Sequence, residues 1–230
     1  MREPAKTREK LLETAIELVW RSNYCSVGVN EICKRAGVTK GAFYHHFESK
    51  ADLFYAAAQF HWEHSKSRWD AIFSPALSPL EQLEHLIDYI LNGHDEHHLF
   101  SSEAPAGAIL EVTGCPFFSA GGQVGLEETR VRQAAVEMAE HSIRYSTAFV
   151  RGLKAGGYLE GDPDAGQVGR MTVLYVHGLL IYARAHNSRA IVEADLRAGL
   201  YRILDIKAEH RRESVPERHQ DASPLVAAGV

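Results

Sequence analysis

The sequence predicts an all-α fold, and three observations support that class. Apolar residues recur at helical spacing through most of the 230 residues, whereas the apolar–polar alternation of a half-buried strand is almost absent. Capping residues, glycines and prolines fall between the periodic segments, where helices begin and end. With 45% apolar and 24% charged residues, the composition excludes a wholly disordered, collagenous or membrane-spanning protein.

Three short helices are expected in the first 50 residues. The first is expected to start after an N-cap at Thr7 and to close at 23–24. The second carries apolar residues at i, i+3, i+4 and i+7 counted from Val29, and Gly37 can supply the left-handed residue that ends it. Thr39 offers an N-cap for the third helix, which carries two phenylalanines on one face.

Longer helices are expected further along the chain. Capping patterns at Ser49–Asp52 and Ser78–Glu81 open two of them. The periodicity breaks down over 92–125, which is rich in glycine, so loops and short helical pieces are expected there. Three more helices are expected at about 126–155, 162–186 and 192–207, followed by a polar tail that frays.

The formal net charge of −5 is unfavourable, at first sight, for binding nucleic acid. The charge is unevenly distributed, however. Residues 1–56 hold 9 Lys and Arg against 7 Asp and Glu, and the rest of the chain holds 16 against 23. The N-terminal part is therefore mildly basic, and the acidic total belongs to the remainder, which leaves a modest phosphate-binding surface at the N-terminus.

The cysteines and the N-terminus bear on the compartment. Cys25, Cys33 and Cys115 are odd in number and lack CxxC spacing, so we expect free thiols in a reducing environment. No signal-peptide pattern is present, and the longest nearly apolar run is too short to span a bilayer. The expected location is the cytoplasm.

The second and third helices have the outline of a helix-turn-helix, whose second helix enters the DNA major groove. The turn Ala36-Gly37-Val38 provides a small residue, a glycine and an apolar plug. The segment 32–53, ICKRAGVTKGAFYHHFESKADL, resembles the DNA-binding domain of TetR-family regulators, whose pattern is roughly I-A-x-x-A-G-V-S-x-G-x-(L/F)-Y-x-(H/Y)-F-x-S-K-x-x-L. The motif resemblance covers residues 7 to about 55, and beyond it only helix count and lengths agree.

This resemblance implies DNA contacts for the start of the third helix. Thr39 matches the residue that caps the recognition helix and touches backbone phosphate. Lys40 matches a position that usually reaches a base edge, where its ammonium would favour guanine acceptors. Gly41 and Ala42 lie where close approach is needed, and Ala42 would meet a thymine methyl.

Further contacts are implied around this helix. Tyr44 matches an aromatic residue whose hydroxyl binds phosphate, His45 a base or phosphate contact, and Lys50 a phosphate contact at the start of the fourth helix. Taken alone, His45 would most often be a solvated histidine, and only the family register makes it a candidate for touching DNA. Lys6 and Arg8 are expected to follow phosphates from the N-terminal arm.

The sequence departs from the family pattern at one position. Gly28 stands where the second helix usually opens with Ser or Thr. Glycine at an N-cap costs only about a few tenths of a kcal/mol. Because its backbone N–H remains free to meet a phosphate, Gly28 stays among the expected DNA contacts.

The domain organisation follows from these observations. We expect a helix-turn-helix DNA-binding domain over 1–52, a ligand-binding and dimerisation helical domain over 53–207, and a flexible tail over 208–230. The last two helices are apolar on more than one face, so they need a second burial partner. The resemblance implies a homodimer formed through these two helices and a twofold, near-palindromic double-stranded DNA operator. No membrane partner is expected.

The resemblance also implies a cavity for a small-molecule effector between the middle helices. The candidate lining residues are apolar or aromatic, and ordinary core packing is the alternative for each of them. They are Phe100, Ile109, Leu110, Phe117, Phe118, Tyr145 and Phe149. No fixed charged pair identifies the effector.

Two features suggest other kinds of sensing. Cys115, within Gly114-Cys115-Pro116, resembles a Gly-Cys element of some electrophile-sensing members of the family, and the alternative is an inert, half-buried thiol. Histidines at metal-ligand spacing are weak candidates for zinc, nickel or copper, and the alternative is a solvated histidine-rich loop. They are His61, His64, His94, His97 and His98. No metal and no other cofactor is expected.

The function expected from the sequence is a ligand-responsive, homodimeric transcriptional repressor that a small molecule releases from its operator. The alternatives are a thiol-based electrophile or redox sensor acting through Cys115, a metal-responsive regulator, and an activator or helical adaptor with a vestigial DNA-binding domain. An enzyme is not expected, because the chain lacks a Ser-His-Asp order, a Gly-rich phosphate loop and an HExxH motif.

Overall fold

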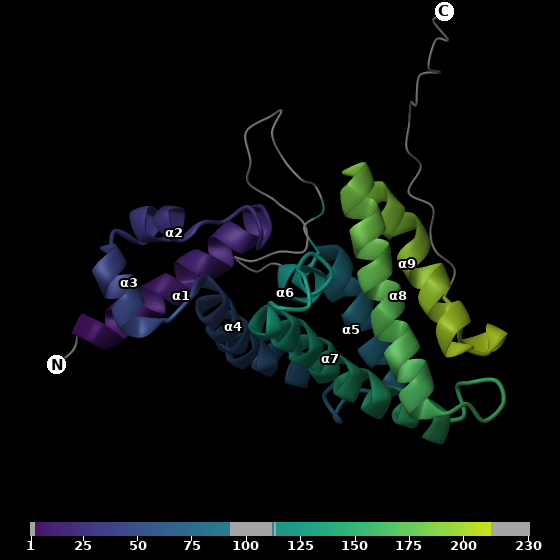
Figure 1. Ribbon diagram of the computed structural model, residues 1–230. Helices are drawn as coiled ribbons and strands as arrows, with labels where there is room; N and C mark the ends of the chain where they lie inside the picture. Colours follow the sequence, from purple (N-terminus) through teal and green to yellow (C-terminus); the bar gives the residue numbers. More distant parts are fainter. Residues whose placement is uncertain (1–2, 93–111, 113, 213–230) are drawn as a thin grey trace, which may run out of the picture.

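The computed structural model describes residues 3–92, 112 and 114–212. Within these residues the chain forms nine α-helices and one short 3-10 helix, and no strand beyond the isolated bridge between Leu159 and Ile206. The predicted all-α class is therefore confirmed. Helices α1–α3 lie at one end of the molecule and α8 and α9 at the other, with α4 and α7 spanning the distance between them (Figure 1).

The N-terminal end contains three helices, as predicted, with a different start for the first. Helix α1 (Glu3–Arg21) begins before the expected cap at Thr7, because the polar residues ahead of Thr7 are compatible with helix and do not stop it. Helices α2 (Val29–Ala36) and α3 (Lys40–His46) follow. Their inward faces meet the buried stripe of α1.

The turn between α2 and α3 is built by local chemistry. Gly37 adopts φ 64°, the left-handed conformation that only glycine adopts without strain, and ends α2. Thr39 is the N-cap of α3, and its Oγ1 accepts a hydrogen bond of 3.1 Å from the backbone N–H of Ala42. Phe43 is fully buried and fixes the other face of α3 in the core.

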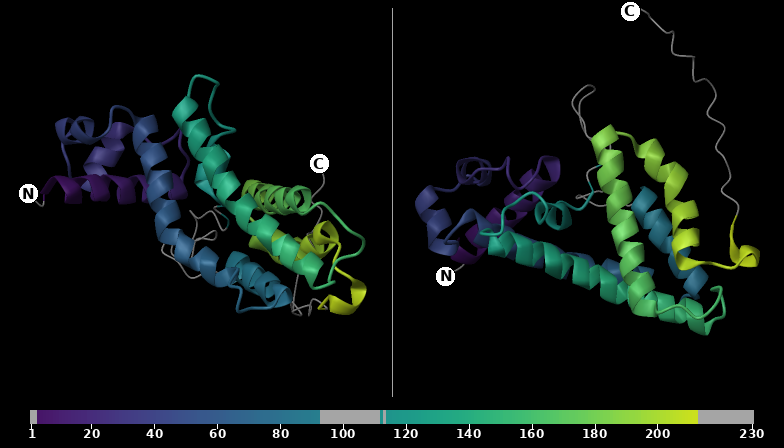
Figure 2. Two further views of the ribbon diagram at one scale, coloured as in Figure 1. Left: turned by 90° about the horizontal axis from the view of Figure 1, so that it is seen from below. Right: turned by 45° about the vertical axis from the view of Figure 1, so that its right-hand side comes forward.

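Two long helices lie side by side and connect the ends of the molecule (Figure 2). Helix α4 (Lys50–Ile72) begins at Ser49, whose Oγ accepts from the backbone N–H of Asp52 at 3.0 Å. Helix α7 (Thr129–Ala155) is followed by Gly156 and Gly157, the second with φ 72°. The sequence predicted that Gly156 and Gly157 would end this helix.

Two shorter helices fill the space beside them. Helix α5 (Pro79–Asn92) opens with a reciprocal capping box, in which the Ser78 N–H donates to Glu81 Oε2 at 2.7 Å and the Glu81 N–H donates to Ser78 Oγ at 3.3 Å. Helix α6 (Pro116–Ala120) is a single short turn packed on α7.

The last two helices differ from the expected bounds by about three residues. Helix α8 (Ala165–His186) starts after Asp164, whose Oδ1 accepts from the Gln167 N–H at 2.6 Å, so this residue rather than 162–163 is the cap. Helix α9 (Arg189–Leu204) begins right after the turn at 187–188 and ends where Asp205 becomes left-handed. No helix in the described part of the chain has the length and apolar character needed to cross a bilayer.

The buried apolar side chains form two clusters. The N-terminal core joins α1–α4 to α6 and the first half of α7, and the C-terminal core joins α5, α8 and α9 to the second half of α7. The boundary expected between 52 and 53 lies in the first turn of α4, so a continuous helix leads out of the N-terminal region. Residues 208–210 form the 3-10 helix, and 213–230 lie outside the described residues.

Candidate DNA-binding surface and internal cavities

The outward face of α3 carries the side chains expected to meet DNA. Thr39, Lys40, Gly41 and His45 are exposed, and Tyr44 is 56% exposed despite its aromatic ring. The Tyr44 ring therefore lies on the surface, whereas the rings of Trp20, Tyr24, Phe43 and Phe47 in the same domain are buried. Next to Lys40 in the first turn of this helix, Gly41 and Ala42 carry little side-chain bulk.

The two glycines on this surface have open space around them. A Cβ placed on Gly28 would meet nothing within 4 Å, and a Cβ on Gly41 would meet only Thr39 Oγ1 at 3.8 Å. Neither glycine is therefore required by packing within the protein. Gly28 caps α2 with extended backbone and no side-chain hydrogen bond, which leaves the first N–H groups of α2 free of a side-chain acceptor.

Lys50 is held in place by Tyr24. Its ammonium donates to the Tyr24 carbonyl oxygen at 3.1 Å and lies 4.1 Å from the centroid of the Tyr24 ring. An ammonium has three donors, so this arrangement positions the charge at the start of α4 and leaves donors for a phosphate. On α1, Lys6 is exposed, and the guanidinium of Arg8 lies 5.4 Å from the ring centroid of Phe47.

An apolar cavity of about 100 Å³, called here the inner cavity, lies among α4, α5, α7 and α8. Trp20, Trp62 and Trp69, the only three tryptophans of the chain, all line it. Its other described walls are aromatic, aliphatic or hydroxyl-bearing side chains, together with Cys115 and two histidines. No Asp, Glu, Lys or Arg occurs among its described lining residues.

A second cavity of about 390 Å³, the outer cavity, adjoins it and is more polar. Asn23, Gln123 and Arg184 line this one. The two cavities share walls at Phe118 and His177, whose rings stack with centroids 4.0 Å apart and an interplanar angle of 9°. This stacked pair stands between the two spaces.

His177 is an uncharged wall of both cavities. It projects from α8, and burial lowers the pKa of its imidazole to about 4 because the charged form loses its hydration. The ring is therefore neutral at pH 7 and can donate from one nitrogen and accept at the other.

The predicted lining residues occupy different positions. Phe118 lines both cavities, whereas Phe117 is fully buried outside them, in the N-terminal core. Tyr145 donates its hydroxyl to Asp70 Oδ1 at 2.5 Å, and Phe149 lies in the C-terminal core. Three further candidates, Phe100, Ile109 and Leu110, lie outside the described residues.

The cysteines differ in their surroundings. Cys115 is half-buried and lines both cavities, and burial raises the pKa of its thiol, which lowers the thiolate fraction at neutral pH. Cys33 is buried and Cys25 is exposed.

The histidines proposed as weak metal ligands are not gathered into a site within the described residues. His61 lies against the rings of Trp20 and Phe117, and His64 Nδ1 is 2.7 Å from the carbonyl oxygen of Phe60 one turn away. No group of three or more metal-ligating side chains occurs among the residues that the structure describes. The other three candidates, His94, His97 and His98, fall outside them.

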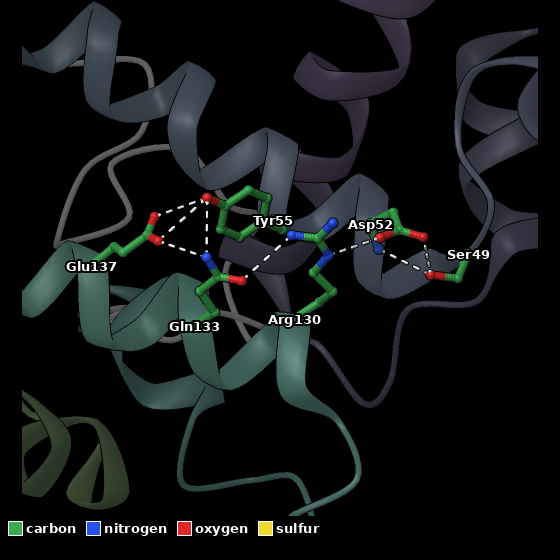
Figure 3. A network of polar contacts seen from close by, with 6 residues as sticks. All are labelled: Ser49, Asp52, Tyr55, Arg130, Gln133 and Glu137. Atoms are coloured by element: carbon green, nitrogen blue, oxygen red, sulfur yellow. Dashed lines mark hydrogen bonds and ion pairs between the residues drawn. The ribbon is translucent and has the colours of Figure 1, made fainter.

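A polar network ties the start of α4 to α7 (Figure 3). Arg130 Nε lies 3.2 Å from Asp52 Oδ1, and the Tyr55 hydroxyl donates to Glu137 Oε2 at 3.1 Å. The guanidinium of Arg130 also lies over the Tyr55 ring, 5.1 Å from its centroid. The residues of the network, with Gln133 and the cap Ser49, come from both helices and fix the DNA-binding end on α7.

Two further contacts reach the DNA-binding end. The Phe117 ring of α6 lies 5.7 Å from the Trp20 ring of α1 and 5.1 Å from the Phe54 ring of α4. Arg184 of α8 donates to the carbonyl oxygen of Ser22, just after α1, at 2.5 Å. Helices α6 and α8 therefore touch both the cavities and the N-terminal end.

Sequence reasoning did not single out most of the cavity walls. Trp62 and Trp69 of α4 and its C-cap residue Phe73 follow one another at helical spacings of seven and four, so their pattern could have indicated an aromatic wall. Ser146 and His177 give no such signal, because a serine or histidine on a helix is usually solvated or bonded within its own helix.

The fold and the exposed α2–α3 surface place the protein among the helix-turn-helix DNA-binding proteins. Residues 11–57 match the model of the bacterial regulatory proteins of the tetR family. The N-terminal part of the chain therefore matches the DNA-binding domain of this family.

Several curated regulators are similar in part. The transcriptional regulator AcuR of Cereibacter sphaeroides is 29% identical over 159 residues, which is 68% of this chain and 66% of that protein. The regulator AcrR of Shigella flexneri is 42% identical over 65 residues, 28% of each chain. An uncharacterized regulator of Lactococcus lactis is 26% identical over 110 residues, 46% of this chain. The matched stretches span 55% and 66% of the Lactococcus and Cereibacter proteins.

Solved structures share the fold across most of the chain. A TetR-family regulator from Agrobacterium tumefaciens has a TM-score of 0.73 at 23% identity and covers 90% of this chain and 100% of its own. The reduced form of NemR from E. coli has a TM-score of 0.69 at 22% identity and covers 87% and 96%.

Proposed function

We propose that the protein is a homodimeric repressor that a small molecule in the inner cavity releases from a near-palindromic operator. One observation carries this proposal. The neighbouring residues Phe117 and Phe118 of α6 face different partners, since Phe117 packs against α1 and α4 while Phe118 lines both cavities. A ligand that displaces Phe118 therefore moves the side chain that supports the DNA-binding end.

The release is a shift between two conformations. A ligand that binds better to the DNA-incompetent conformation raises its population by that difference in affinity. Trp20 of α1 strengthens the coupling, because it contacts the Phe117 ring and lines the inner cavity itself. In this account the DNA-binding domain is 1–52 and the ligand-binding and dimerisation domain is 53–207.

The proposed dimer uses the outward face of α8. Met171, Leu174, Ile181 and Tyr182 are between 45% and 56% exposed, and they share this face with Gly178, beside which a Cβ would meet nothing within 4 Å. An apolar helix face with a gap at its middle suits close packing of a second helix. The variant Leu174→Arg is expected to convert a dimer into a monomer in light scattering and to lose operator binding.

The proposed DNA contacts divide into base reading and phosphate binding. Lys40 reads a base edge, with Gly41 and Ala42 allowing close approach. Phosphates are bound by Lys50, by the side chains of Thr39 and Tyr44, and by the backbone of Gly28. His45 contacts a base or a phosphate.

A gel-shift titration with DNA from upstream of the gene tests the proposal. We expect a sequence-specific shift that weakens with salt, and no such shift at any protein concentration contradicts the proposal. Lys40→Ala should relax the choice of base by about 1–3 kcal/mol at one position of each half-site. Lys50→Ala should weaken all sequences alike and flatten the salt dependence. Lys66→Ala, an exposed lysine on α4 away from this surface, is the matched control.

A thiol-based form of the same switch is favoured by one observation, the position of Cys115 at the meeting of the two cavities. Its raised pKa acts against it, because the thiolate is the reactive form. Alkylation of the cysteines followed by mass spectrometry distinguishes the thiol switch from ligand sensing without the thiol. Ligand sensing without the thiol predicts that exposed Cys25 is modified first, whereas fastest modification of Cys115 supports the thiol switch.

A further inference from the structure

The inner cavity contains one hydroxyl group that the fold leaves without a partner. Ser146 of α7 is 5% exposed and lines this cavity, and its Oγ has no hydrogen-bond partner among the described residues. Leaving a buried hydroxyl unbonded is costly, and such groups in folded proteins have a partner in nearly all cases. An unbonded hydroxyl at a cavity wall therefore indicates a partner that enters from the cavity.

The other hydroxyl groups of the same cavity are already bonded. Ser142, one turn before Ser146 on the same helix, donates to the Met138 carbonyl oxygen at 3.3 Å. Thr172 donates to the Val168 carbonyl oxygen at 2.9 Å, and the Ser65 hydroxyl lies 3.3 Å from His61 Nε2. Ser146 thus differs from its neighbours by its free bonding capacity and not by its residue type.

The walls of the inner cavity select against charge. Its described lining has no Asp, Glu, Lys or Arg. Burial keeps His177 neutral, so no formal charge on the described wall would compensate that of a ligand. Transferring an unpaired charge into such surroundings costs far more than transferring a neutral polar group.

The shape of the inner cavity favours a flat apolar group. Trp62 and Trp69 of α4 and the C-cap residue Phe73 form an aromatic wall, which stacks well on another ring. Its volume of about 100 Å³ is of the order of the roughly 150 Å³ cavity that accepts a benzene ring. The adjoining outer cavity of about 390 Å³ has room for a substituent beyond the ring pair of Phe118 and His177.

We propose that the inner cavity binds an uncharged aromatic ring that carries a hydroxyl or carbonyl group, and that this group hydrogen-bonds to the Ser146 hydroxyl. Phenols, aryl ketones and aryl amides belong to this class, while aromatic acids and aromatic amines that are charged at pH 7 do not. This inference rests on the proposed function for its consequence on DNA, since it names the class of effector of that same cavity.

Binding of three matched probes to the full-length protein tests the inference. The probes are 4-methylphenol, toluene and 4-methylbenzoate, which share one ring and differ in their polar group. The three tryptophans all line the inner cavity, so quenching of their fluorescence reports occupancy, and titration calorimetry gives an independent affinity. We expect 4-methylphenol to bind about tenfold more tightly than toluene, and 4-methylbenzoate to bind more weakly than either.

A pair of variants isolates the hydroxyl. Ser146→Ala is expected to weaken 4-methylphenol about tenfold and to leave toluene unchanged, with no loss of thermal stability of the unliganded protein. Ser22→Ala removes a hydroxyl that donates to the Leu18 carbonyl oxygen at 2.9 Å and lines neither cavity, so it should leave the affinities of both probes unchanged. Equal effects of the two variants on 4-methylphenol overturn the inference, as does 4-methylbenzoate binding as tightly as 4-methylphenol, or no binding of any probe.

A gel shift with the same protein samples separates this inference from the proposed function. If specific DNA binding persists while the probes fail, the ligand class is wrong and the regulator proposal stands. If the probes behave as expected but no specific DNA binding is found, the ligand class stands and the proposed function is wrong. If 4-methylphenol releases bound DNA from the wild-type protein and does so less well from Ser146→Ala, both the ligand class and the proposed function are supported.

Discussion

The recognition surface and the inner cavity are built in opposite ways. The surface is assembled within 28–50 of the chain, from two short helices, their caps and a glycine turn. The cavity takes walls from 20 to 180, and residues more than 100 positions apart meet in it. Local chemistry is sufficient to shape the surface, whereas the cavity exists only when helices distant in the sequence, from α1 to α8, are packed together.

The two regions also use side chains differently. The recognition surface exposes small residues and flexible cationic side chains around one tyrosine. The cavity is lined by bulky aromatic groups, and its described lining contains no charged side chain. Helix α6 carries one phenylalanine that packs against α1 and α4 in the N-terminal core and one that lines the cavity. The geometry of the surface is therefore fixed by local bonds, whereas that of the cavity depends on tertiary packing.

The largest expected effect concerns the two phenylalanines of α6. Phe117→Ala should lower the free energy of unfolding by about 3–5 kcal/mol, because it removes a fully buried ring between α1, α4 and α6. Phe118→Ala should cost clearly less, since its ring is half-buried at a cavity wall. Urea unfolding measures both, and equal losses would remove the distinction between the two sides of α6.

The next effect is the pH dependence of stability caused by His177. Its pKa is about 4 in the folded state against 6.5 as the ordinary value. Between these values the unfolded chain holds a proton that the folded chain lacks, so the free energy of unfolding falls as the pH drops from about 6.5 to about 4.

The full change from this group amounts to about 3 kcal/mol. His177→Phe retains an aromatic ring for the stack with Phe118 and should flatten the stability curve over this range. Urea unfolding at a series of pH values measures it, and identical pH profiles for the variant and the wild type would show that His177 is hydrated.

Gly41→Ala is expected to cause the smallest change in stability. It should also have a separate effect on operator affinity. A methyl group fits within the protein, and alanine in place of a helical glycine should stabilise by about 0.5–1 kcal/mol. The same methyl stands on the surface that approaches DNA and should lower operator affinity about tenfold. Thermal unfolding and gel shifts on one sample check both, and unchanged operator affinity would place Gly41 away from the DNA.

The fold was largely predictable because its helix ends are local events. Gly37, Thr39 and the Ser78–Glu81 box act through bonds within a few residues, and the sequence shows them directly. The observed start of α1 and the observed bounds of α9 differ from the predicted ones, because capping-type residues such as Thr7 lie equally well within a helix.

The cavity could be predicted only in outline. Phe117 and Phe118 are adjacent and chemically identical, yet only the packing of α6 decides which one lines a cavity. The free hydroxyl of Ser146 is likewise invisible in the sequence, because Ser142 one turn away is bonded to its own helix. Such properties depend on tertiary contacts and not on residue type.

Selection of binding sites from random DNA by the full-length protein tests the central claim most directly. The account predicts enrichment of a near-palindromic site whose half-site centres lie about 10 base pairs, or a multiple of that, apart. Lys40→Ala should enrich a site with relaxed preference at one position of each half-site. A pool that enriches no sequence, or a site without twofold symmetry, would contradict the account.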